Sequence, residues 1–131
     1  MNAKEKASED ERAKRNFPLN VAKFEMTVLH DDGMYRHLRF ANPENNNCWF
    51  QIVHTPGQLT ISGDMGCFTF SRKMDMFQFF NADAGREINP DYWIQKLFTY
   101  EPVGNRAFPY YRFIWACYAI QYAIREYRRL T

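Results

Sequence analysis

The chain has 131 residues, which is enough for one domain with a single hydrophobic core and too few for two. Hydrophobic residues make up 46% of it and aromatic residues 18%, a composition that excludes an intrinsically disordered chain. The formal net charge is +2, from 17 Lys and Arg against 15 Asp and Glu, so the marked basic excess typical of nucleic-acid-binding domains is missing.

The cysteines and the N-terminal segment indicate a compartment. Cys48, Cys67 and Cys117 are an odd number without a CxxC pair, which is typical of a reduced intracellular protein. The chain opens Met-Asn-Ala-Lys-Glu-Lys, without an apolar signal segment, and no apolar run approaches the ~20 residues that span a bilayer. We therefore expect a cytoplasmic protein that does not associate with membranes.

The first 16 residues differ in character from the rest. Residues 1–16 carry mixed charges and no large apolar side chain after Met1, so we expect a disordered charged tail ahead of a single α+β domain over residues 17–131. From Phe24 to Val28 apolar and polar residues alternate, as in a half-buried strand. Asp32-Gly33 then predicts a hairpin turn, with Met34 to Phe40 as the return strand.

Three more strands follow the first hairpin. Pro43 and the asparagines after it predict a loop before a third strand, Cys48 to His54. Pro56-Gly57 predicts a turn into a fourth strand, Gln58 to Ser62, and Gly63 to Gly66 connects this to a fifth, Cys67 to Phe70. Short strands joined by tight loops predict a five-stranded antiparallel meander.

After Phe70 the spacing of the apolar residues changes from that of strands to that of helices. Ser71 predicts the cap of a short helix whose apolar stripe holds Met74, Phe77 and Phe80. Asn89-Pro90 predicts the start of a second helix reaching about Tyr100. Residues 109–130 contain no Gly or Pro after Pro109 and place five side chains on one stripe at helical spacing, Phe113, Cys117, Ile120, Ile124 and Tyr127. The sequence thus predicts a long C-terminal helix and two shorter helices packed on one face of the sheet.

A series of short strings carries a resemblance to a known family. They are VLHDDGMYRHLRF, NCWF, TPGQLTISGDMG, TFSR, DMFQFF and INPDYW, in this order between residues 28 and 93. This order resembles a family of small uncharacterised proteins carried by tailed bacteriophages and prophages. The chain departs from the family pattern at Gln51, where an acid is usual, and at Cys67-Phe68, where the family has a Thr-aromatic pair.

The resemblance implies a phage or mobile-element origin but not a reaction, and it carries no catalytic residues over to this chain. Small phage proteins of this size are often counter-defence proteins, including anti-CRISPR inhibitors. We therefore expect a non-enzymatic protein, without cofactors, that binds and inhibits or modulates a host protein or ribonucleoprotein complex, such as an immune effector, in the cytoplasm of the bacterial host.

The final helix supplies the residues expected to contact such a partner. Tyr and Arg are enriched at interface hot spots, and rings lie on a side of this helix away from its apolar stripe. This side faces either the second predicted helix, through Tyr92, Trp93 and Phe98, or another chain, as a homodimer or a target. For the second case the predicted contacts are Tyr110, Tyr111, Arg112, Tyr118, Arg125 and Arg128.

A nucleic-acid-binding phage regulator is a second hypothesis, less favoured because of the low net charge. Aromatic residues on a sheet face stack on bases while arginines hold phosphates, as in single-strand binders. Tyr35, His37 and Arg39 share one face of a strand, as do Trp49 and Gln51 on the next. The residues predicted for this role are Tyr35, Arg36, Arg39, Trp49 and Arg72.

A metal-dependent hydrolase or nuclease is a third hypothesis. Imidazole and carboxylate groups ligate divalent metals if the strand ends bring them together. The candidate ligands are His30, Asp31, Asp32, His37 and Asp64, although the aspartates are also explained as turn residues. His54 ends the third strand nearby, and nothing in the sequence activates the cysteines as nucleophiles.

Overall fold

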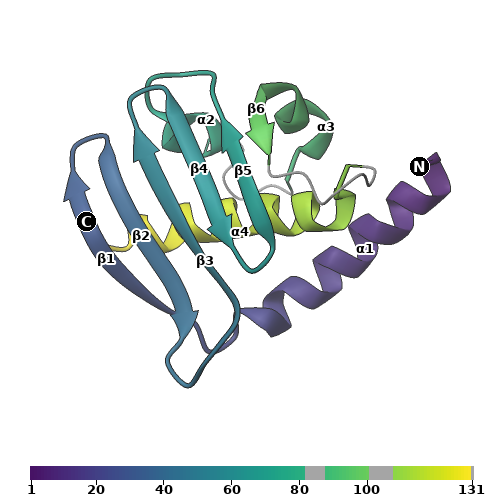
Figure 1. The fold of residues 1–131 in the computed structure, drawn as a ribbon, viewed down its shortest axis with the longest axis horizontal. Helices are drawn as coiled ribbons and strands as arrows, with labels where there is room; N and C mark the ends of the chain where they lie inside the picture. Colours follow the sequence, from purple (N-terminus) through teal and green to yellow (C-terminus); the bar gives the residue numbers. More distant parts are fainter. Residues whose placement is uncertain (82–87, 101–107, 131) are drawn as a thin grey trace.

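The computed structural model describes residues 1–81, 88–100 and 108–130, and in this part of the chain it shows an α+β fold (Figure 1). An open antiparallel sheet holds six strands in the order β1-β2-β3-β4-β5-β6. The strands are β1 (Glu25–Asp32), β2 (Tyr35–Asn42), β3 (Asn45–Thr55), β4 (Gln58–Gly63), β5 (Gly66–Phe70) and β6 (Leu97–Tyr100). The helices are α1 (Ala3–Asn20), α2 (Met76–Asn81), α3 (Pro90–Trp93), which continues into the 3-10 turn η1 (Ile94–Lys96), and α4 (Tyr110–Arg128).

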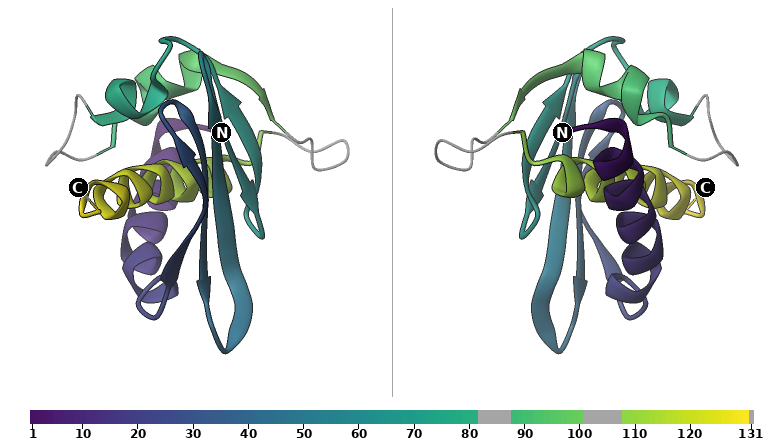
Figure 2. Two further views of the ribbon diagram at one scale, coloured as in Figure 1. Left: turned by 90° about the vertical axis from the view of Figure 1, so that its left-hand side faces the viewer. Right: turned by 90° about the vertical axis from the view of Figure 1, so that its right-hand side faces the viewer.

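The α+β class, the first five strands and the long last helix agree with the sequence prediction. Alternation places Leu38 and Phe40 of β2 on the same face as Phe50 and Ile52 of β3, and all four are at most 1% exposed. The helices α1, α2 and α4 lie on this side of the sheet, as the two side views show (Figure 2). The core therefore forms between one face of the sheet and a helical layer.

The helix α4 presents the predicted stripe to the sheet. Four of its five members, Phe113, Cys117, Ile120 and Ile124, are at most 2% exposed, and Tyr127 is half-buried. Phe113 packs its ring edge-on against Phe68 of β5, with centroids 5.6 Å apart. The prediction for this element is confirmed.

Residues 1–16 were expected to be disordered, but they form most of the helix α1, which packs along α4 (Figure 1). The side chain of Asn2 caps the helix by accepting a hydrogen bond from the Glu5 N–H at 2.8 Å. Ala13, Phe17 and Val21, spaced by four residues, are buried on its inner side. This single narrow stripe, within a strongly charged segment, is enough to dock the helix.

The sheet has a sixth strand that the prediction missed. Leu97 to Tyr100 was expected to continue the second helix, but α3 ends at Trp93 and the chain turns to pair with β5. The pairing runs through Thr69 and Thr99, whose side chains share one face of the sheet. The predicted start of this helix at Pro90 is confirmed, because Pro fits the first helical position.

The helix α2 begins later than predicted. Ser71 does not cap it; the side chain of Asp75 accepts a hydrogen bond from the Phe77 N–H at 3.0 Å instead. As a result Met74, predicted on the apolar stripe, is 61% exposed, while Met76 is fully buried.

Gly63 permits the close approach of β3 and β4 at one end of the sheet. Its φ is +150°, and a Cβ atom at this position would lie 2.2 Å from the carbonyl oxygen of Trp49. Cys48, just before Trp49, has a φ of +62°, and its N–H donates to the Asp64 carboxylate at 2.8 Å. The backbone here is shaped by a glycine and a capping acid.

Candidate functional site

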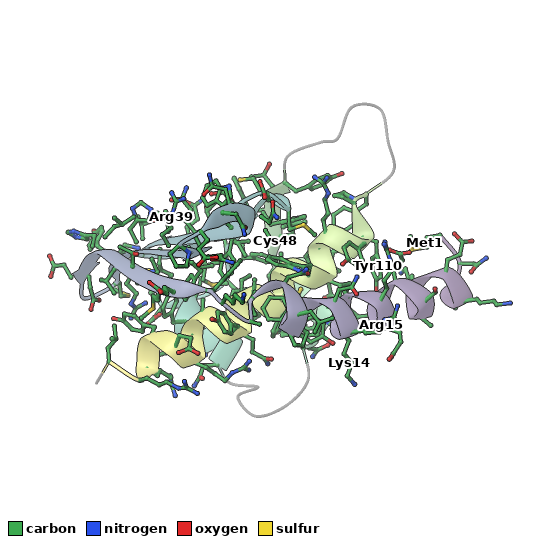
Figure 3. The ribbon with its side chains drawn as sticks, turned by 90° about the horizontal axis from the view of Figure 1, so that it is seen from below. Met1, Lys14, Arg15, Arg39, Cys48 and Tyr110 are labelled. Carbon is green, nitrogen blue, oxygen red and sulfur yellow. The ribbon has the colours of Figure 1, made fainter. Side chains whose placement is uncertain are left out.

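The face of the sheet opposite the helices is the main candidate site. Among the described residues no helix covers it, and Arg39 lies on it, on the side away from Tyr110 and Lys14 (Figure 3). We call this surface the open face. By strand alternation and register it carries Thr27 and His30 of β1, Tyr35, His37 and Arg39 of β2, Trp49, Gln51 and Val53 of β3, Thr60 and Ser62 of β4, Cys67 and Thr69 of β5, and Thr99 of β6.

Hydrogen bonds between neighbouring strands fix the polar side chains of the open face. His37 Nε2 lies 2.7 Å from Gln51 Oε1, and since an amide oxygen only accepts, this nitrogen carries the hydrogen. The Gln51 amide then donates to Ser62 Oγ at 3.2 Å. The Thr60 and Thr69 hydroxyls are 2.9 Å apart. These side chains are held in place before any partner arrives, which reduces the entropy lost on binding.

Two aromatic rings and one guanidinium lie on the part of the open face formed by β2 and β3. The Arg39 guanidinium lies over the Trp49 ring, 4.8 Å from its centroid. Tyr35 is 52% exposed. Tyr, Trp and Arg are the residue types most often found at the energetic centres of protein interfaces.

The open face carries little positive charge. In the described part of the chain its one cation is Arg39, while Glu25 pairs with Ala41 and Asp32 with Tyr35 along the same side of β1. Phosphate binding depends on several cations acting together, each releasing counterions. The charge of this surface is therefore better suited to a protein than to a nucleic acid.

The set predicted for nucleic acid does not come together. Tyr35, Arg39 and Trp49 lie on the open face as expected, but Arg36 points to the opposite side of β2. Its guanidinium donates two hydrogen bonds to Asp75, at 2.9 and 3.2 Å, and lies 4.3 Å from the centroid of the Phe77 ring. Arg72 follows β5 in an exposed segment before α2. Grouping Arg36 with Arg39 was wrong, because residues an odd number of positions apart in a strand face opposite ways.

The set predicted for a metal is also dispersed. His30 and His37 are opposite each other on β1 and β2, but Asp31 accepts a hydrogen bond from the Tyr127 hydroxyl at 2.6 Å on the helical side. Asp64 caps Cys48 in a separate turn, and Asp32 pairs with Tyr35 at the hairpin end. Within residues 1–81, 88–100 and 108–130 no three His, Cys, Asp or Glu side chains are grouped as metal ligands.

In the set predicted on the final helix, the three tyrosines pack against α1 and the three arginines are exposed. The Tyr110 hydroxyl donates to Asp10 at 2.9 Å, and the Asn16 amide donates to the Tyr111 hydroxyl at 3.1 Å. Arg12 lies over the Tyr111 ring at 3.9 Å. Tyr118 is half-buried, while Arg112, Arg125 and Arg128 are exposed. The aromatic side of this helix thus packs on the segment expected to be a tail.

Burial and the acid on α1 act together on Tyr110. Desolvation raises the pKa of its phenol well above the ordinary value, and the hydrogen bond to Asp10 raises it further. Tyr110 therefore stays protonated, as a donor, over the whole physiological range of pH.

A polar cluster under the sheet joins β2, α2 and α4, and sequence patterns did not reveal it. Burial alone would raise the pKa of Asp75, but the hydrogen bonds and the charge of Arg36 outweigh this and lower it. The imidazole of His54, 1% exposed, accepts from the Met76 N–H at 2.8 Å and lies 2.7 Å from the Met34 carbonyl oxygen. His54 is fully buried beneath the sheet, the side chains of Arg36 and Asp75 are 10% and 18% exposed, and the cluster anchors α2.

The thiols of Cys48 and Cys117 are not activated. Burial, followed by the negative charge of Asp64, raises the pKa of Cys48. Burial raises the pKa of Cys117 still more strongly, because this side chain is fully enclosed in the core. Neither group has the lowered pKa that a nucleophilic cysteine needs.

The chain was compared with models of protein families, with curated proteins and with solved structures, and none of the three comparisons found a match. Across the described residues, no helix has both the length and the apolar character needed to cross a bilayer.

Proposed function

We propose that this protein acts by binding another protein through the open face of its sheet. The observation that carries the proposal is a sheet face that no helix covers among the described residues, on which Tyr35, Arg39 and Trp49 lie beside the hydrogen-bonded His37 and Gln51. Aromatic and Arg anchors surrounded by fixed polar groups are the composition of an interface.

The low charge of the open face favours a protein partner over a nucleic acid, as argued above. The resemblance to phage and prophage proteins makes a protein or ribonucleoprotein complex of the bacterial host, such as an immune effector, the first class to test. In this proposal the protein inhibits by occupying a surface of its target rather than by chemistry.

The test is affinity capture of the tagged full chain from bacterial lysate, with and without nuclease, followed by quantitative mass spectrometry. The variant Y35A/R39E removes one exposed ring and reverses one charge on the open face. The matched control R15E/L19A reverses one charge and truncates one apolar side chain at exposed positions of the helical layer.

We expect a stoichiometric complex that survives nuclease, is retained by the control and falls at least about tenfold with Y35A/R39E. Capture that disappears with nuclease would favour the nucleic-acid hypothesis instead. Equal capture by both double variants would show that the open face is not the interface.

A further inference from the structure

A groove on the helical side of the molecule is separate from the open face. It has a volume of about 790 Å³ and runs between the C-terminal part of α1, the start of β1 and one side of α4. Sites for small organic ligands usually have volumes of about 300–1,000 Å³. The size of the groove is therefore that of a ligand site.

The floor of the groove is aromatic and rigid. Phe17 stacks on Tyr118 with centroids 5.9 Å apart and meets Tyr122 edge-on at 5.8 Å. Tyr122 in turn packs edge-on against Phe40 of the sheet at 5.6 Å. Phe24, just before β1, adds a further half-buried ring. Because the core fixes these rings, they offer a preformed surface to a flat apolar group.

The rim of the groove is positively charged. Lys14 of α1 and Arg125 of α4 line it, and Lys14 extends outward from its helix (Figure 3). The one acid among the lining residues, Glu126, is 3.4 Å from the guanidinium of Arg129, which lowers its effect on the groove. Arg125 is oriented by the largely buried Gln121, whose carbonyl oxygen lies 3.4 Å away. Two cations over an apolar floor complement a ligand that has an acidic group on an apolar body.

We propose that this groove binds a small amphipathic organic anion. The apolar body lies on Phe24, Tyr118 and Tyr122, and the carboxylate, sulfonate or phosphate is held by Arg125 and Lys14. The groove shares no residue with the open face. The test of ligand binding in the groove is therefore independent of the test of the proposed function.

The test uses the fluorescent anion anilinonaphthalene sulfonate and its uncharged analogue phenylnaphthylamine, titrated into the full chain and followed by fluorescence and calorimetry. The variant Arg125→Gln removes the cation, and Ala22→Trp fills the groove from an exposed position on its edge. Arg112→Gln, an exposed arginine on the first turn of the same helix, is the matched control.

We expect one saturable site, preferring the sulfonate to the neutral probe by roughly fivefold or more. Arg125→Gln should abolish this preference while neutral binding remains, Ala22→Trp should abolish both, and Arg112→Gln should change neither. Displacement by laurate would extend the ligand class to aliphatic acids.

Unaltered binding in Ala22→Trp, no saturable binding in the natural chain, or equal affinity for both probes would overturn the proposal. Because these dyes also bind loosened proteins, each variant is checked by thermal unfolding. Amide shifts in NMR spectra must map to Phe24, Tyr118 and Tyr122, and shifts elsewhere would count against the groove.

Discussion

His54 offers the sharpest test of how the sheet and α2 are held together. Its imidazole accepts from the buried N–H of Met76 through Nε2 and donates from Nδ1 to the carbonyl oxygen of Met34, at 2.8 and 2.7 Å. Both contacts require the neutral ring with its hydrogen on Nδ1. Leucine fills a similar volume but has no ring nitrogen. The substitution His54→Leu therefore removes the hydrogen-bond partner of the Met76 N–H and that of the Met34 carbonyl oxygen.

The cost follows from what the substitution leaves unpaired. An unsatisfied buried backbone group costs about 1–3 kcal/mol. Met76 is 0% exposed, so its N–H has no access to water, whereas Met34 is half-buried and its carbonyl recovers part of the loss. We expect His54→Leu to lower the free energy of unfolding by about 2–4 kcal/mol at neutral pH.

The same geometry sets the sign of a pH effect. Burial lowers the pKa of His54, the Met34 carbonyl and Asp75 act in the opposite sense, and the Arg36 charge lowers it further. The folded-state pKa thus lies below the unfolded value of about 6.5. The contribution of His54 is complete above about pH 6.5 and is lost as the pH falls, by at most about 1.4 kcal/mol per pH unit.

Urea unfolding of both proteins at several pH values between about 7.5 and 5 checks this. The difference between the natural chain and His54→Leu should shrink as the pH falls. If the two curves remain parallel, or if His54→Leu costs less than about 1 kcal/mol, the assigned hydrogen-bond roles of His54 are wrong.

Three further substitutions test other parts of the fold by urea or thermal unfolding. Gly63→Ala should lower the free energy of unfolding by about 3 kcal/mol, because the added Cβ would meet the backbone of β3. Gly57→Ala has open space around its Cβ, so its cost is only the strain of a positive φ. Equal losses for the two variants would contradict the close approach of β3 and β4 at Gly63. Phe17→Ala should cost about 3–5 kcal/mol by opening the contact between α1 and α4, and Leu19→Ala, 75% exposed, should stay within about 0.5 kcal/mol; a small loss for Phe17 would mean that α1 is not docked. Arg36→Met should cost about 2–4 kcal/mol at neutral pH by leaving its carboxylate partner uncompensated. That loss should diminish below about pH 4, because Asp75 is then protonated even in the unfolded chain and no longer needs the charge of Arg36. A loss that does not change with pH would argue against the ion pair.

Strand alternation and helical spacing predicted most of the sheet and the last helix, because each of these elements buries one regular face. The same alternation placed Tyr35 and Arg39 together correctly on the open face. The prediction for Arg36 was wrong because it considered the positive charge of the segment and not the face of the strand on which each arginine lies. Its partner, Asp75, lies 39 residues away and is invisible to local patterns.

The missed elements depend on tertiary contacts. The helix α1 has a weak apolar stripe and is fixed by pairs such as Tyr110 with Asp10 and Trp115 with Asn20, about 100 residues apart. The strand β6 has four residues and follows a genuine helix start signal, so only its pairing with β5 defines it. The groove arises where α1 meets α4, and could not be predicted while α1 was taken for a tail.

The order of elements along the chain has a consequence for synthesis on the ribosome. The meander β1–β5 is complete about 40 residues before α4 begins at Tyr110, so its apolar face emerges without the helix that will cover it. Leu38, Phe40, Phe50 and Ile52 are then open to solvent during translation, as is the inner stripe of α1. Nascent chains in this state tend to aggregate and are typical clients of chaperones. A pause in translation just before α4 would prolong this state, so the yield of folded protein should depend on how fast that segment is made.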